Sequence, residues 1–117
     1  MIRHENENGS VIVSSSVYTD IAGAAATNCF GVKGMAARSV KDGLYHLLRK
    51  ESNAKGVNVR FHEDNTISID LHIMVDNGVN LNAVGASIIS EVRYVVTSTT
   101  GTEVRAVNVY IDSMMIG

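Results

Sequence analysis

The residues best suited to chemistry are a single cysteine, Cys29, and four histidines. Such residues could bind a metal or supply a thiol nucleophile with an imidazole base. Cys29 ends an alanine-rich segment directly before Phe30, where a buried and unreactive thiol is the favoured interpretation. His62 and His72 fall on two strands whose expected pairing separates them by roughly 20 Å. This spacing excludes a metal shared by these two histidines, and we expect no cofactor.

The acidic and hydroxyl residues form no recognisable catalytic pattern either. The sequence contains no Ser/His/Asp order, no nucleophile elbow, no phosphate-binding loop and no paired carboxylates spaced for acid and base catalysis. The carboxylates fall in turns and on the polar faces of strands. We therefore expect that the protein is not an enzyme.

One glycine motif is compatible with nucleic-acid binding. Gly31, Val32, Lys33 and Gly34 form a GxxG sequence between two expected helices, the arrangement with which KH domains clamp a nucleic-acid backbone. Glycines that allow a tight turn between helices explain the same motif. The net charge of −2, the isoelectric point near 6.0 and a polar sheet face with only Tyr110 for base stacking all argue against RNA. RNA binding through this loop is therefore the alternative function, and nucleic acid is not the favoured partner.

A central hairpin, from Gly56 to Gly78, must position most of these side chains. Apolar and polar residues alternate along both halves of this stretch, which is the period of half-buried strands. A three-residue loop, Glu63 to Asn65, makes Phe61 face Ile67, and all the remaining apolar residues of the shorter strand then also face an apolar partner. A slip of one residue would scatter the apolar residues over both faces, so pattern and turn predict one register.

Helices are expected on either side of this hairpin, over residues 17–28, 39–50 and 81–99. The last has the clearest apolar stripe, with Asn80 as its N-cap and Gly101 as its stop. A short strand, Ser10 to Ser14, precedes the first helix. A final strand covers residues 107–111, with a bulge near Arg105.

The expected order, β-α-α-β-β-α-β, defines an α+β domain. We predict a two-layer sandwich, in which helices lie on one face of a mostly antiparallel four-stranded sheet. Residues 1–8 are polar and are expected to be a disordered N-terminal arm. Residues 9–117 are expected to form a single domain.

Composition bounds the cellular setting. The 117 residues are 45% hydrophobic and 19% charged, which is typical of a globular protein. No apolar run approaches the roughly 20 residues that span a bilayer, so we expect no direct membrane insertion. A lone cysteine and the absence of a leader favour a cytoplasmic location.

Several segments, taken in order, resemble the alkaline shock protein family of Gram-positive bacteria, also called the envelope stress response proteins. They are GSVIVSSSV, IAGAAATNCFGVKGM, DGL, KGVNVRF, TISIDLHIMVDNGVNL and TGTEVRAVNVYI. The resemblance implies a non-enzymatic cytoplasmic scaffold linked to cell-envelope stress or homeostasis. It also implies recruitment to the membrane periphery through a membrane-anchored protein partner. A homo-oligomer is compatible with this role.

The polar face of the sheet is the candidate protein interface. If the helices cover the apolar face, the opposite face presents a set of adaptable side chains. The alternative is that this face is simply the solvated side of an antiparallel sheet. The candidate residues are Arg60, Asp70, His72, Met74 and Tyr110.

Overall fold

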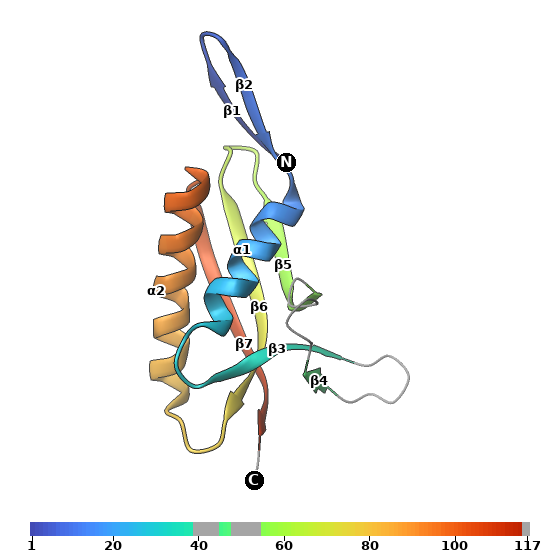
Figure 1. Ribbon diagram of the computed structural model, residues 1–117, viewed down its shortest axis with the longest axis vertical. Coiled ribbons are helices and arrows are strands. Elements are labelled where there is room, and N and C mark those ends of the chain that lie inside the picture. The colour runs from blue at the N-terminus through green and yellow to red at the C-terminus, as the bar shows by residue number, and fades with distance from the viewer. Residues whose placement is uncertain (39–44, 48–54, 116–117) are drawn as a thin grey trace.

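Two helices cover one face of a mostly antiparallel sheet in the computed structural model, which describes residues 1–38, 45–47 and 55–115 (Figure 1). This arrangement confirms the predicted α+β class. The elements are β1 (Ile2–Asn6), β2 (Gly9–Val13), α1 (Ser15–Thr27), β3 (Val32–Arg38), β4 (Tyr45–Leu47), β5 (Val57–Phe61), β6 (Ile67–Asp76), α2 (Leu81–Thr100) and β7 (Val104–Met115).

Strand β6 is the centre of the five-stranded sheet because three strands pair with it. β5 pairs antiparallel with its first half and β3 with its second half, so these two strands share one edge of β6. β7 runs parallel to β6 along the other edge, from Val104 to Met115. Every second residue of β6, from Ile67 to Val75, is fully buried beneath the helices.

The central hairpin has the predicted register. Phe61 pairs with Ile67, and Val59 pairs with Ile69. Asn65 has a φ of 68°, the left-handed conformation expected at the end of the loop. Tyr18 of α1 packs edge-on against Phe61, with ring centroids 5.9 Å apart, and so fixes α1 over this end of the sheet.

Helix α2 also begins and ends at the predicted caps. The Asn80 side chain accepts a hydrogen bond of 3.0 Å from the backbone N–H of Ala83, and Gly101 adopts the left-handed conformation. The buried stripe consists of Val84, Ile88, Val92 and Val96. α2 is the crossover that parallel strands require, since it carries the chain from β6 to β7.

The predicted helix at residues 39–50 is wrong where the structure describes it. Residues 45–47 form strand β4, which pairs with β3, and residues 32–38 form β3 itself. The remainder of the prediction lies outside the described residues. The sequence of β3 has low β propensity, and its pairing with β6 overrides that preference. With β4 added at its edge, the main sheet has five strands among the described residues.

The N-terminal residues are not the predicted disordered arm. Ile2–Asn6 is strand β1, which pairs with β2 in a hairpin that projects beyond the end of the main sheet (Figure 1). Ile2 is 1% exposed and belongs to the core. His4 contacts the Thr102 hydroxyl at 3.2 Å, and the Tyr18 hydroxyl lies 2.6 Å from the same oxygen. Burial of one isoleucine and this polar contact hold the hairpin base in place.

Candidate protein-interaction site

The five residues of the candidate interface come from β5, β6 and β7, and the register places them all on the sheet face opposite the helices. Arg60 pairs with Ser68, which shares the face of Asp70 and His72. Tyr110 is the direct partner of His72. We call this surface the outer sheet face: Arg60, Ser68, Asp70, His72, Met74, Asn108, Tyr110 and Asp112.

Asp70 organises the centre of the outer sheet face. Its carboxylate accepts hydrogen bonds from Arg60 at 3.2 Å and from the Asn108 amide at 2.9 Å. Partial burial raises the pKa of Asp70, but these hydrogen bonds and the Arg60 charge outweigh it and leave the pKa below its ordinary value. The carboxylate is therefore ionised at neutral pH, and it holds two neighbouring side chains in fixed positions.

A second contact group lies beside it on β6 and β7. The rings of His72 and Tyr110 stack with centroids 4.7 Å apart, and His72 Nδ1 lies 2.9 Å from the Asp112 carboxylate. The Tyr110 side chain remains 48% exposed. The outer sheet face thus offers an aromatic ring and a guanidinium group that are both accessible and held by neighbours.

Met74 does not belong to this accessible surface. It lies on the same face, where it pairs with Gly34 of β3 and Ser113 of β7, but it is only 6% exposed. The prediction that Met74 contributes to a contact surface is therefore wrong.

The GxxG motif does not join two helices. Gly31 lies in the turn after α1, and Val32, Lys33 and Gly34 open strand β3. Gly31 has a φ of 87°, and a Cβ there would lie 3.0 Å from Val84 and 3.2 Å from Val79. Its glycine is thus required by packing against α2. Without a second helix at this point, the geometry of a KH loop is absent.

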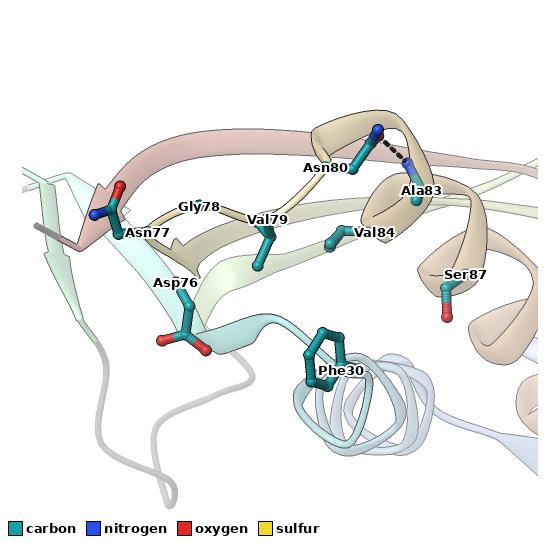
Figure 2. A pocket seen from close by; sticks show the side chains of 9 residues that line it. All are labelled: Phe30, Asp76, Asn77, Gly78, Val79, Asn80, Ala83, Val84 and Ser87. Carbon is teal, nitrogen blue, oxygen red and sulfur yellow. Dashed lines mark hydrogen bonds between the residues drawn. The ribbon is translucent and has the colours of Figure 1, made fainter.

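An apolar pocket of ≈ 590 Å³ opens beside this turn (Figure 2). Val79, Ala83 and Val84 line one side, and the Phe30 ring stands at the rim with 89% of its surface exposed. The Asp76 backbone N–H donates a hydrogen bond of 2.9 Å to the Gly31 carbonyl, which ties the two pocket-forming turns together. The sequence analysis did not predict this pocket. The feature that could have indicated it is Phe30, an aromatic residue directly before a glycine turn.

Cys29 directly precedes Phe30 of the pocket rim, and its burial disfavours the nucleophilic thiolate form. It is half-buried against the core, and its thiol contacts the Ala25 carbonyl at 3.5 Å. Burial raises the pKa of the thiol, and the Glu91 charge raises it further against the opposing effect of a hydrogen bond with Ser87. The thiol is thus half-buried rather than buried, and its lack of reactivity stays a prediction.

Three histidines are engaged separately, at different parts of the molecule. His4 contacts Thr102, His62 contacts Ser68 at 2.7 Å, and His72 contacts Asp112. Across residues 1–38, 45–47 and 55–115, no three His, Cys, Asp or Glu side chains come together as metal ligands. The side chain of the fourth histidine, His46, lies outside the described residues.

Fold and surface together define a small α+β domain whose sheet has one face beneath the helices and one face turned outward. The chain belongs to the alkaline shock protein 23 family, which has a cell envelope-related function, and the family model matches residues 3–116. The resemblance to the alkaline shock proteins is thereby confirmed.

Two relatives match the chain over nearly its whole length. YloU of Bacillus subtilis is 38% identical over 109 residues, which cover 92% of this chain and 90% of that protein. Spy1614 of Streptococcus pyogenes is 34% identical over 116 residues, with 98% and 95% covered. Neither name states an activity.

The fold also occurs in a solved structure of MamM CTD in its manganese form. The TM-score is 0.52 at 16% identity, and the match covers 86% of this chain and 99% of that chain. A second MamM CTD structure gives a TM-score of 0.50 at 15% identity, with coverage of 84% and 93%. At these identities the likeness concerns the fold alone.

Within the described part of the chain, neither helix combines the length and apolar character that a membrane crossing requires.

Proposed function

We propose that this protein is a non-enzymatic cytoplasmic scaffold in cell-envelope homeostasis or stress. It contacts protein partners through the outer sheet face. A membrane-anchored partner recruits it to the inner side of the envelope. The family's envelope-related function supports the setting of this proposal.

The observation that carries the proposal is the ordered but accessible surface around Asp70 and Asp112. Arg60 is 51% exposed and is held by Asp70, while Tyr110 is 48% exposed and is stacked on His72. Arginine and tyrosine are enriched at the energetically important positions of protein interfaces. Because their neighbours already fix them, a partner that binds these side chains loses little conformational entropy.

The charge of the helices supports recruitment through a partner. α1 carries no lysine or arginine, and α2 carries one, Arg93. Attachment of a helix to anionic lipid headgroups requires a strongly basic polar face. We therefore expect the purified protein to remain at the bottom of a flotation gradient with protein-free anionic vesicles. Flotation with those vesicles would contradict recruitment through a partner.

Partner capture tests the outer sheet face directly. We would crosslink tagged protein in its native host and compare the wild type with Tyr110→Asp and Arg60→Ser. The matched control is Tyr94→Asp, because Tyr94 of α2 is also exposed, at 70%, and receives the same substitution on the helical side. Capture of one defined partner should be lost in both outer-face variants and retained in the control. Capture that survives both would refute the role of this face.

A further inference from the structure

Strand β7 leaves one long edge of the sheet unpaired. Among residues 1–38, 45–47 and 55–115, it pairs only with β6, although it is 12 residues long. Figure 1 shows β7 at the margin of the sheet, with α2 alongside it. An open edge exposes a row of backbone N–H and C=O groups that can pair with another strand.

The middle of this edge lacks the usual protection against such pairing. From Ala106 to Ile111 the strand contains no charged residue and no proline. The two irregularities in its register occur outside this stretch, where Arg105 and Asp112 are each left without a partner on β6. The central six residues are therefore a regular, neutral strand.

An apolar groove of ≈ 340 Å³ follows the same edge on the helical side. Val109 and Ile111 are half-buried at its floor, because α2 covers this part of β7 incompletely. Gly85 leaves a gap in the helix wall, since a Cβ at that position would meet nothing within 4 Å. The α2 residues along the groove are all uncharged: Leu81, Asn82, Gly85, Ala86 and Ile89.

We infer that this edge binds a second copy of the chain, with the two β7 strands antiparallel around a twofold axis at Val109. Because the axis is perpendicular to the sheet, the helical faces of both copies lie on one side of the joined sheet and their outer faces lie on the other. Val109 then lies opposite itself, and Val107 lies opposite Ile111 on the helical side. On the outer side, Asn108 lies opposite Tyr110. Each pair is thus apolar with apolar or polar with polar.

Charge distribution favours an identical copy over a different partner. A twofold axis brings each residue close to its own counterpart, so any charge near the axis would face a like charge. The strand centre and the groove wall are neutral, which removes this repulsion. The absence of a side chain at Gly85 also leaves room for the two α2 helices to approach each other.

The available area agrees with a stable dimer. Ten residues of strand extend over roughly 33 Å, and the molecule is 22 Å thick along its shortest axis. Contact along this side is therefore comparable with the roughly 800 Å² per partner of a standard interface. In such a dimer the two outer sheet faces become one continuous surface.

Sedimentation velocity of the full chain tests the inference, with Gly85→Glu as the decisive variant. An interface of this size should hold two copies together at ~50 μM protein. The wild type should then sediment as a species of twice the monomer mass. Gly85→Glu should sediment as a monomer because it places two like charges near the axis. Its fold should not suffer, because glutamate is a better helix former than glycine. The matched control is Ser90→Glu, an exposed position of α2 outside the groove, which should remain dimeric.

Disulfide trapping tests the register independently. In a Cys29→Ser background, Val109→Cys should form an intermolecular disulfide under mild oxidation, since the two residues face each other across the axis. Val107→Cys should not crosslink, because it lies four residues away from its counterpart, far beyond the reach of a disulfide.

Two results would overturn the inference: a monomeric wild type at this concentration, or a dimer that survives Gly85→Glu. These results are separable from the outer-face proposal. Arg60 lies on β5, away from β7, so Arg60→Ser should remain dimeric while losing its partner. Gly85→Glu should keep an intact outer sheet face and still capture that partner as a monomer.

Discussion

His72 lies face to face with Tyr110, with an interplanar angle of 10° between their rings. The stacking follows from the register, since the two residues are direct neighbours on parallel strands. Cross-strand aromatic contacts of this kind stabilise a sheet modestly and fix ring orientation. The outer sheet face is therefore structured by its own side chains, while the tyrosine remains open to solvent.

Two aspartate substitutions on the outer sheet face should lower the free energy of unfolding by very different amounts. Tyr110→Asp should change the free energy of unfolding by about 1 kcal/mol, since the ring is half-exposed. Met74→Asp should lower stability by about 3 kcal/mol or more, because it places an unpaired charge at a buried position. Urea unfolding of both variants measures the difference. Equal costs would mean that Met74 is not buried in solution.

Two glycines with the same backbone conformation should respond differently to alanine. Gly31 and Gly78 have φ values of 87° and 86°, so each substitution carries the conformational cost, about 1 kcal/mol. Only Gly31→Ala also brings a Cβ within 3.0 Å of Val84, whereas the space around Gly78 is open. Urea unfolding should show that Gly31→Ala is the more destabilising variant. A larger loss for Gly78→Ala would contradict the packing role of Gly31.

The correctly predicted parts of the fold are those in which several local signals agree. In the β5–β6 hairpin, the alternation of apolar residues and the tolerance of Asn65 for a left-handed turn require the same register. In α2, the Asn80 cap, the apolar stripe and Gly101 all delimit one helix. Agreement among independent local features makes such segments predictable without tertiary information.

The wrong predictions concern segments whose secondary structure is determined by tertiary contacts rather than by local sequence. Residues 32–38 have no alternating pattern, and β3 forms because β6 offers a free edge beside β5. The N-terminal hairpin is held by contacts with distant parts of the chain: Ile2 and Val13 pack against the core, and His4 contacts the hydroxyl of Thr102. Within the candidate site, the alternation of side chains along a strand correctly placed Tyr110 on the outer sheet face. Alternation alone could not reveal that Met74, on the same face, is buried.

The buried hydroxyl of Thr102 should matter more than that of its partner Tyr18. Tyr18→Phe leaves Thr102 in contact with His4, so a loss of about 1 kcal/mol is expected. Thr102→Val leaves the hydroxyl of the fully buried Tyr18 without its hydrogen-bond partner. This variant should lower the free energy of unfolding by up to about 3 kcal/mol. Urea unfolding measures both losses. Hydrogen exchange should also show faster opening of β1 in Thr102→Val, and unchanged protection there would argue against the tether.

Asp70 should make the folded state sensitive to acid. Its folded pKa lies below the ordinary value, so the ionised carboxylate stabilises the fold at neutral pH. That contribution is present above the unfolded pKa of about 3.9 and is lost as pH falls from there through the folded pKa. Asp70→Asn should therefore lose less stability than the wild type between about pH 6 and about pH 3. Asp20→Asn, which removes an exposed carboxylate of α1, is the control. Urea unfolding across this range would disprove the assignment if the Asp70→Asn and wild-type curves ran parallel.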